Sequence, residues 1–254
     1  MKNKIVFISG ANSGIGKACA EKFAENGANL ILCSRDIEKL IKVADAINKK
    51  FDTEILTYQL DVSDRAKVQM IIDELPKKWQ KIDVLINNAG GALGMDKFQN
   101  GSIDDWDEMI DSNVKGLLYL SRNIVPLMIK NKKGHVINIG SIAGVAAYPN
   151  GAVYCGVKAA VRLISDGLRM DTVDTPVRVT NIQPGLVETN FSVVRFHGDE
   201  ERAKKVYQGL KPLTADDIAD IVFFSASLPG HVQICEVTVT PTSQASATVV
   251  HRES

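Results

Sequence analysis

The sequence predicts an α/β fold in which a parallel β-sheet is covered by helices on both faces. Short apolar runs alternate with longer helical patterns along almost the whole chain of 254 residues. Within the runs, Val, Ile and Leu follow one another nearly without interruption, which is typical of strands buried on both faces. This alternation predicts a doubly wound parallel sheet. No repeat or linker divides the sequence, so we expect one domain over residues 1–254.

Seven segments are expected to be strands. Six are short apolar runs, and the seventh is a weaker run near the end of the chain. They are residues 4–9 (KIVFIS), 28–34 (ANLILCS), 54–60 (EILTYQL), 82–88 (IDVLINN), 134–141 (GHVINIGS), 177–183 (VRVTNIQ) and 234–241 (ICEVTVTP).

Between these runs, apolar residues recur at spacings of three and four, as they do on one face of a helix. The pattern predicts helices over residues 16–27, 37–50, 106–127 and 215–227. Gly27 suits the C-terminal stop of the first helix. Pro126 is expected to kink or end the third.

Composition and charge exclude several classes of function. Lys plus Arg and Asp plus Glu both number 30, so charge gives no argument for binding nucleic acid or an anionic membrane. No apolar stretch is long enough for a signal peptide or a membrane span. The four cysteines (Cys19, Cys33, Cys155 and Cys235) have no C-x-x-C spacing and are expected to be reduced thiols of a cytoplasmic protein. The four histidines have no metal-ligand spacing, so we expect them to be exposed and predict no metal site.

The turn after the first predicted strand is rich in glycine. The sequence SGANSGIGKA places glycines at positions 10, 14 and 16, between a strand and a helix. Glycine there lets the backbone turn tightly and approach a pyrophosphate at the helix N-terminus. The spacing is G-x-x-x-G-x-G rather than G-x-G-x-x-G, and a tight turn also needs glycine for steric reasons alone. Both readings stay open at this point.

The end of the second predicted strand favours NADP. An acidic residue at this place normally holds the NAD ribose, whereas an arginine accommodates the additional phosphate of NADP. Here Ser34 occupies the acidic position and Arg35 follows, with a guanidinium suited to phosphate. Asp36 comes next and leaves some room for NAD, although it also suits the cap of the following helix.

A tyrosine–lysine pair is the strongest catalytic signal. Tyr154 precedes Lys158 by four residues, which puts both on one face of a helix. A nearby cation favours phenolate, and a tyrosine whose pKa falls below its usual value of about 10 can act as a base. Tyr148 leads into the turn signal Pro149–Asn150–Gly151 and has no cation at this spacing. We therefore expect Tyr148 to be at most a wall of a substrate pocket.

Motifs along the whole chain resemble those of the short-chain dehydrogenase/reductases. They are SGANSGIG (9–16), DV (61–62), NNAG (87–90), Asn113, Ser141, YCGVK (154–158) and QPGLVET (183–189). The resemblance implies a single-domain Rossmann-type doubly wound parallel sheet of about seven strands in the order 3-2-1-4-5-6-7. Further stretches, among them LPKKWQKIDVLINNAGGALG and GLVETNFSVVRFHGD, look like the bacterial and fungal 3-hydroxy-acid dehydrogenases. That group oxidises L-allo-threonine, serine and related short 3-hydroxy acids with NADP.

The resemblance also implies roles for individual residues. Tyr154 would be the base, Lys158 would bond the nicotinamide ribose, and Ser141 would bond the substrate oxygen. Asp61 would meet the adenine amino group, and Val187 and Thr189 the nicotinamide carboxamide. By resemblance, the residues that contact NADP are Gly10, Asn12, Ser13, Gly14, Ile15, Gly16, Arg35, Asp61, Val62, Asn88, Ala89, Gly90, Tyr154, Lys158, Pro184, Gly185, Val187 and Thr189.

Asn113 is the one polar residue among the inward positions of the third predicted helix. Its expected inward neighbours are the apolar residues Ile110, Val114, Leu117 and Leu118. Two readings are open. Asn113 is either a buried amide satisfied by backbone groups or, by the resemblance, the fourth catalytic residue, holding a water that links Lys158 to solvent.

The segment of about 186–213 follows the Pro184–Gly185 turn, where the family places a mobile substrate lid. Arg195 is the only arginine in the stretch before His197, and a guanidinium matches a carboxylate in bidentate fashion. We expect Arg195 to bind the substrate carboxylate; the alternative is an ordinary ion pair. Cys155, beside the predicted base, is expected to be a packed small apolar residue rather than a redox-sensitive gate.

These features favour an NADP-dependent oxidoreductase for short 3-hydroxy acids and the matching carbonyls. A reductase of 3-oxoacyl thioesters or of other ketones is the first alternative, because one fold hosts all of these activities. A non-catalytic NADP sensor is the second alternative, but such proteins typically lack the tyrosine or the lysine. The resemblance also implies a homotetramer in which the helices around 105–130 and 152–170 meet across subunits. The apolar residues of these helices are equally compatible with an internal core.

Overall fold

Seven parallel strands form one sheet in the computed structural model of the chain, which describes residues 1–253. The strand order is β3-β2-β1-β4-β5-β6-β7, which confirms the order that the family resemblance implied. Each pair of neighbouring strands runs in the same direction. The strands are β1 (Ile5–Ser9), β2 (Asn29–Ser34), β3 (Ile55–Gln59), β4 (Val84–Asn87), β5 (Gly134–Ile139), β6 (Val177–Pro184) and β7 (Glu236–Val239).

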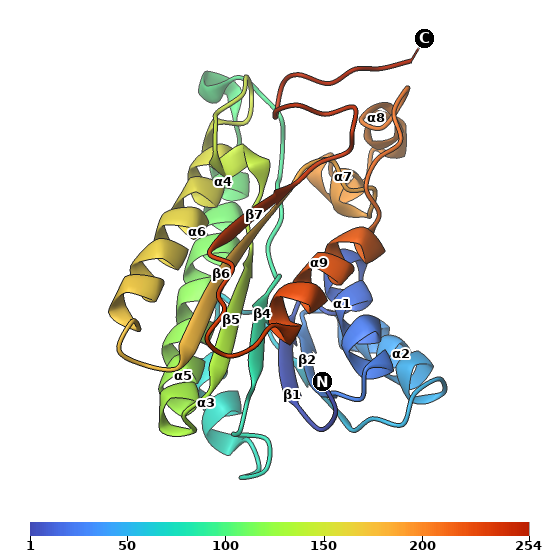
Figure 1. Cartoon of the computed structure of the whole chain (residues 1–254). Coiled ribbons are helices and arrows are strands. Elements are labelled where there is room, and N and C mark those ends of the chain that lie inside the picture. Colours follow the sequence, from blue (N-terminus) through green and yellow to red (C-terminus); the bar gives the residue numbers. More distant parts are fainter. Residues whose placement is uncertain (254) are drawn as a thin grey trace.

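Helices cover both faces of this sheet (Figure 1). One layer consists of α1 (Gly14–Glu25), α2 (Ile37–Asn48) and α9 (Ala215–Ser227). The opposite layer consists of α3 (Arg65–Glu74), α4 (Ile103–Ile110), α5 (Gly116–Lys130) and α6 (Ala152–Asp171). Two short helices, α7 (Phe191–Arg195) and α8 (Glu200–Lys205), lie apart from both layers, beyond the carboxyl ends of the strands.

The register of the central strands explains why apolar residues occupy nearly every strand position. Phe7 of β1 pairs with Ile31 of β2 and with Leu85 of β4, and all three belong to the core under α3 and α5. The alternate residues, such as Ile8, belong to the core under α1 and α9. Because successive side chains point to opposite faces, a strand covered on both faces needs apolar residues throughout.

Local signals at the helix ends act as predicted. Gly27 follows α1 with a φ of +77°, a left-handed conformation that favours glycine. The Asp36 carboxylate caps α2 by accepting a 3.0 Å hydrogen bond from the backbone N–H of Lys39. The four cysteines are free thiols, as expected.

The predicted helix over 106–127 is interrupted. A π-turn, Asp111–Lys115, joins α4 to α5, and the Asn113 side chain donates at 2.9 Å to the carbonyl of Met109, an acceptor one turn earlier. Pro126 lies inside α5 and does not end it, because the helix continues to Lys130. The expectation that Ile110 and Leu118 point inward is wrong, since they are 38% and 41% exposed. The inward row is formed by Met109, Asn113, Leu117 and Leu120.

The expectation of exposure is also wrong for His135. It lies within β5, in register with Arg178 of β6, and is buried because helices cover both faces of this strand. Its Nε2 lies 2.7 Å from Oγ1 of Thr180, which itself donates to the carbonyl of Ile234. Burial lowers the pKa of His135 to about 3. His135 is therefore a neutral part of the core.

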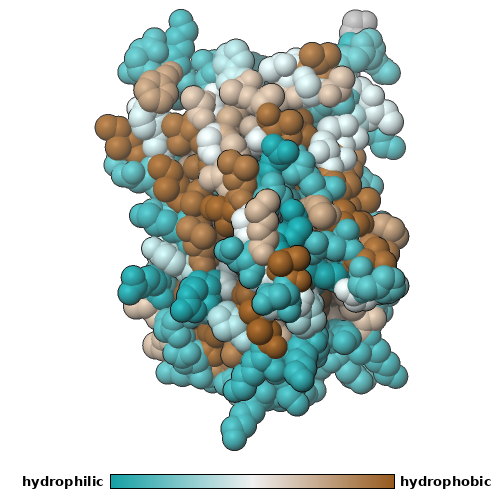
Figure 2. Space-filling view, turned by 60° about the vertical axis from the view of Figure 1, so that its left-hand side comes forward, coloured by the Kyte–Doolittle hydropathy of each residue, from teal (hydrophilic) through white to brown (hydrophobic). Residues whose placement is uncertain are grey.

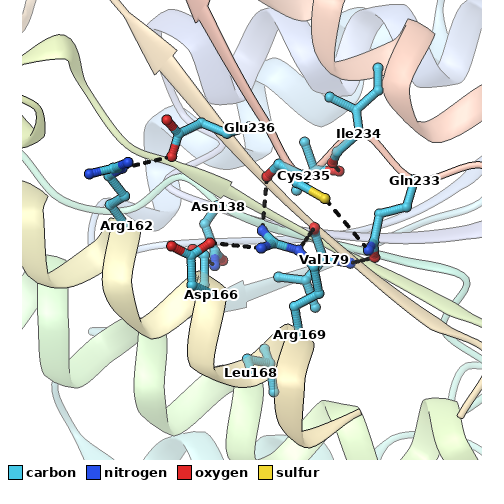
Figure 3. Close-up of polar contacts among 12 residues, drawn as sticks. Asn138, Arg162, Asp166, Leu168, Arg169, Val179, Gln233, Ile234, Cys235 and Glu236 are labelled. Atoms are coloured by element: carbon cyan, nitrogen blue, oxygen red, sulfur yellow. Dashed lines mark hydrogen bonds and ion pairs between the residues drawn. The ribbon is translucent and has the colours of Figure 1, made fainter. Parts of the chain in front are cut away.

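The last strand is tied to α6 by arginines (Figure 3). Arg169 donates to the carbonyls of Val179 and Cys235, at 3.2 and 2.9 Å. Arg162 forms a 2.9 Å ion pair with Glu236 at the start of β7. These bonds hold the edge of the sheet next to the end of β6. Among residues 1–253, no helix is both long and apolar enough to cross a membrane.

Candidate active site

The glycine-rich turn between β1 and α1 has the close backbone approach that the sequence suggested. Gly10 and Gly14 have φ values of +65° and +52°. A Cβ at position 16 would lie only 2.3 Å from the carbonyl oxygen of Gly10. The turn itself therefore requires glycine at position 16. This agrees with the interpretation that a tight turn needs glycine for steric reasons.

The same turn leaves a place for an anion. Ser13 is the N-cap of α1, yet within residues 1–253 its side chain makes no capping hydrogen bond. The first amides of a helix need acceptors, and phosphate is an effective one. Asn88 braces the turn, because its Nδ2 donates to the carbonyls of Ser9 and Gly10 at 3.0 and 3.1 Å. The turn thus fits a dinucleotide pyrophosphate.

Arg35 and Asp36 divide their roles at the end of β2. Asp36 is engaged in the cap of α2, whereas the Arg35 side chain is 64% exposed and forms a 2.7 Å ion pair with Glu108 of α4. An exposed ion pair of this kind contributes little and is readily exchanged. Arg35 is therefore the residue of the two that is free to meet a phosphate.

The residues after β3 line the site beside Arg35. Asp61 uses one carboxylate oxygen within its own turn, accepting from the backbone N–H and the hydroxyl of Ser63 at 2.9 and 2.7 Å. Val62 is buried against α5, where a Cβ at Gly116 would collide with it. Gly90, after β4, has a φ of +138° and leaves room for the Asn113 side chain.

The predicted nicotinamide end is built around the end of β6. Gly185 donates to the carbonyl of Val239 at 2.7 Å, and the backbone N–H of Leu186 donates to Oε1 of Gln244 at 2.8 Å. Thr189 lies beside Gly14, so the nicotinamide end of the predicted cofactor site is close to its pyrophosphate part. Gln244 was not predicted from the sequence, because it acts across 58 residues of chain.

Ser141, Tyr154 and Lys158 come together at the carboxyl end of β5. Ser141 caps the 3-10 turn Ile142–Gly144 and lies close enough to Tyr154 to lower the pKa of its hydroxyl. Lys158 Nζ donates to the carbonyl of Ile139 at 3.0 Å and lies 5.9 Å from the Tyr154 ring centroid. The three side chains that the sequence predicted to be catalytic therefore occupy one site.

Burial controls the protonation of this site. It raises the pKa of Tyr154 above the ordinary value of a phenol, with a further increase from Tyr148, and the nearby Ser141 side chain and the charge of Arg195 act in the opposite direction. Burial also lowers the pKa of Lys158 to about 8. The lysine alone thus does not make Tyr154 a strong base, contrary to the simplest expectation from the sequence.

Asn113 is only half satisfied by backbone groups. Its Nδ2 donates to the carbonyls of Gly91 and Met109, both at 2.9 Å. Its Oδ1 is buried and has no hydrogen-bond partner among residues 1–253. Asn113 and Lys158 line the same small cavity, together with Asn87 and Ser9. Asn113 is therefore not an amide whose hydrogen bonds are all made by backbone groups, because Oδ1 has no partner within residues 1–253.

Arg195, at the end of α7, is buried to 9% exposure against Tyr148 and Tyr154. Its Nε donates to the carbonyl of Gly94 at 3.1 Å, and its Nη1 donates to the Tyr148 hydroxyl at 3.1 Å. Within the described chain, its Nη2 is buried without a partner. Arg195 therefore does not form an ordinary ion pair. Tyr148 does more than line a pocket, because its hydroxyl binds Arg195.

A pocket joins these groups. Arg195, Tyr154, Gly94 and Asp105 all line it, with Trp106 and Met109 on the side of α4. Arg195 is the residue of segment 187–213 that lines it, and a parallel bridge between Val187 and Leu213 joins the two ends of this segment. Cys155 is buried, as expected of a packed residue. No group of metal-ligating side chains occurs among residues 1–253.

Comparison with known proteins agrees with this geometry. A family model described as short chain dehydrogenase matches residues 4–200. An NADP-dependent 3-hydroxy acid dehydrogenase of Salmonella typhi is 45% identical over 98% of this chain and 99% of its own. A protein of the same description from Schizosaccharomyces pombe is 41% identical over 100% and 98% of the two chains. The solved closed form of serine dehydrogenase complexed with NADP+ superposes with a TM-score of 0.91, at 42% identity, over 98% and 100% of the two chains. The chain belongs to the short-chain dehydrogenase/reductase family.

Proposed function

We propose that this oxidoreductase, which acts on CH–OH groups with NADP as its cofactor, oxidises the 3-hydroxyl of short 3-hydroxy acids and reduces the matching carbonyls. L-allo-Threonine, serine and 3-hydroxypropionate are the substrate types. One observation carries the proposal: Arg195, whose Nη2 is buried without a hydrogen-bond partner within residues 1–253, lines the same pocket as Tyr154.

Arg195 supports an acidic substrate because its remaining donor needs an acceptor. A buried donor without a partner costs about 1–3 kcal/mol, and more for a charged group. A substrate carboxylate satisfies this donor and the guanidinium charge together. The relatives with NADP-dependent 3-hydroxy acid dehydrogenase in their names agree with this substrate class.

Tyr154 is proposed to take the proton of the substrate hydroxyl while Ser141 bonds the same oxygen. NADP+, when bound, would supply the hydride acceptor and a positive charge that lowers the pKa of the phenol. That charge is needed, because burial raises the pKa of Tyr154 in the protein alone. Lys158, fixed by the Ile139 carbonyl, keeps the proton acceptor and the ribose side of the site in place.

Asn113 is proposed to complete a proton path. Its free Oδ1 and the Lys158 side chain belong to one small polar cavity. A water in such a cavity has the polar partners that it needs. The proton taken by Tyr154 then has a route past Lys158 toward solvent.

The alternatives have less support. A 3-oxoacyl thioester is long, whereas the buried guanidinium of Arg195, which lines the pocket beside Tyr154, suits a short acidic substrate. A non-catalytic NADP sensor does not require Ser141, Tyr154 and Lys158 to meet.

A relative named sulfoacetaldehyde reductase 2, from Chromohalobacter salexigens, is 41% identical over 98% of this chain and 99% of its own. Sulfonates are therefore a second class of anionic substrate to test, because a sulfonate group also suits Arg195.

We also propose a homotetramer that uses the outer face of α4, α5 and α6. Figure 2 shows hydrophobic side chains gathered on this side of the molecule. Leu163, Met170 and Val173 are 66%, 73% and 84% exposed there, and Leu118 is 41% exposed. A large exposed apolar patch indicates an interaction surface. Light scattering after size-exclusion chromatography tests this, and a monomer would contradict it.

A substrate panel tests the proposed activity. L-allo-Threonine, L-serine, 3-hydroxypropionate and 3-hydroxyisobutyrate are assayed with NADP+, and a 3-oxoacyl thioester and sulfoacetaldehyde with NADPH. We expect turnover of the hydroxy acids, and reduction of the thioester alone would contradict the proposal.

Arg195→Ala should raise KM for the acids by about 10–100-fold, which corresponds to the loss of a hydrogen bond to a charged group. Lys204→Ala, on the exposed face of α8, is the control. An unchanged KM in Arg195→Ala would remove Arg195 from the substrate site.

A further inference from the structure

A second charged group faces the substrate pocket beside Arg195. Asp105 of α4 lines the pocket, and its side chain is only 16% exposed. Gly94 connects the two charged residues. Its N–H donates to the carbonyl of Arg195 at 2.9 Å, and its carbonyl accepts from Arg195 Nε at 3.1 Å. A Cβ at position 94 would lie 3.1 Å from Oδ2 of Asp105.

The role of Asp105 in the helix start does not explain this orientation. Asp105 occupies the third position of α4, and its backbone N–H donates to the Ser102 hydroxyl at 3.3 Å. In a capping box the carboxylate at this position bonds back to the N-cap amide. Within residues 1–253, that reciprocal bond is present at α9 but absent at α4. The Asp105 carboxylate turns toward the pocket instead.

The known partner of Asp105 accounts for one oxygen only. His197 Nε2 lies 3.1 Å from Oδ2, and the His197 side chain is 60% exposed. The other oxygen makes no side-chain hydrogen bond within residues 1–253 and is not fully buried, so it stays accessible to a donor from a ligand. The charged side chains that line the pocket are Arg195, Asp96 and Asp105. A substrate whose only charged group is a carboxylate pairs with Arg195. It also adds a negative charge beside Asp96 and Asp105.

We propose that Asp105 binds the ammonium group of a 2-amino-3-hydroxy acid whose carboxylate is held by Arg195. Asp105 thereby determines the preference for such zwitterions over 3-hydroxy acids that lack the amino group. The carboxylate and the ammonium share one carbon, and the reacting hydroxyl is on the next carbon. This matches a pocket in which Arg195, Asp105 and Tyr154 all face one small space, with the Arg195 guanidinium 5.6 Å from the Tyr154 ring centroid. The inference rests on the proposed 3-hydroxy acid dehydrogenase activity.

The test compares two substrates that differ by one amino group. L-Serine and 3-hydroxypropionate are assayed with NADP+, and the ratio of their kcat/KM values is the readout. Asp105→Asn keeps the shape of the side chain and can still accept from His197, but it removes the negative charge. We expect the ratio of serine to 3-hydroxypropionate to fall by about 10–100-fold, as for the loss of a hydrogen bond between charged groups. Asp105→Ser, which suits the first turn of a helix, is the second variant.

His197→Ala is the matched control. It removes the side-chain hydrogen bond of Asp105 with segment 187–213 and leaves the Asp105 carboxylate in place, so the ratio should stay close to that of the wild type. Equal losses for both substrates in the Asp105 variants would mean that Asp105 acts by holding this segment, and would overturn the proposal. An unchanged ratio would overturn it too, as would a wild type that oxidises 3-hydroxypropionate but not serine. A wild type that oxidises neither would instead contradict the proposed function.

Discussion

The hydroxyl of Tyr148 accepts a 3.1 Å hydrogen bond from Nη1 of Arg195, although the two residues are 47 positions apart in the chain. The guanidinium carbon of Arg195 lies 5.7 Å from the Tyr148 ring centroid. Together with the bond from Nε to Gly94, this contact directs the remaining nitrogen, Nη2, away from protein acceptors. Tyr148 is thus a positioning residue for Arg195.

Removal of the Tyr148 hydroxyl should weaken substrate binding more than it slows the chemical step. In Tyr148→Phe, Nη1 of Arg195 loses its acceptor and the guanidinium is no longer fixed. We expect KM for 3-hydroxy acids to rise by about tenfold, in line with the loss of a hydrogen bond to a charged group. The value of kcat should change less. Steady-state kinetics with 3-hydroxypropionate measure both, and a fall in kcat with unchanged KM would contradict the positioning role.

Gly16→Ala should impair cofactor binding. The added Cβ would lie 2.3 Å from the Gly10 carbonyl, so the backbone of the turn must move. Overpacking of this kind costs about 1–3 kcal/mol, which corresponds to a roughly 5–150-fold increase in the Kd of NADPH if the strain falls on the bound turn. Titration of NADPH fluorescence measures this Kd.

The control for that variant is Gly230→Ala, in the exposed turn after α9, where a Cβ would meet open space. It should bind NADPH as the wild type does and gain about 0.4–1 kcal/mol of stability, because alanine restricts the unfolded chain more than glycine does. If Gly16→Ala binds NADPH normally, the turn is not the phosphate site.

Lys158→Met should make the protein more stable at neutral pH. Burial lowers the pKa of Lys158 from 10.5 to about 8. Below pH 8 the lysine is charged in both states, and its burial reduces the free energy of unfolding. Between pH 8 and 10.5 only the unfolded state holds the proton, so the wild type gains stability as the pH rises.

The free energy of unfolding of the variant should therefore exceed that of the wild type by about 2–3 kcal/mol at pH 7. This difference should shrink between pH 8 and 10.5. Urea unfolding at several pH values measures it. Lys97→Met, at an exposed position, is the control and should show no such trend. A difference that does not vary with pH would contradict a charged, buried Lys158.

The sequence predicted the sheet well because its strands are short, apolar and covered on both faces. The pair Tyr154–Lys158 was also predictable, since helical spacing alone puts both side chains on one face. The order of the strands came from the family resemblance, because local patterns do not specify which strands become neighbours.

The parts that were missed depend on contacts between distant segments. Nothing near Tyr148 or Gln244 in the sequence indicates their partners, which lie 47 and 58 residues away. On α4 and α5 the inward positions Asn113 and Leu117 were predicted correctly, whereas Ile110 and Leu118 are exposed because a π-turn between the two helices shifts the helical period. His135 was misplaced because a histidine inside a strand resembles an exposed residue until both faces of that strand are known to be covered.

The turnover of 3-hydroxy acids by Tyr154→Phe tests most directly whether Tyr154 is the base. If Tyr154 takes the proton of the substrate hydroxyl, removal of its own hydroxyl should lower kcat for 3-hydroxy acid oxidation by about 10²–10⁴-fold, the usual contribution of a general base. The variant should still bind NADPH, and Tyr148→Phe, which removes the hydroxyl bonded to Arg195, should keep most of kcat. Turnover by Tyr154→Phe at a rate close to that of the wild type would contradict the claim.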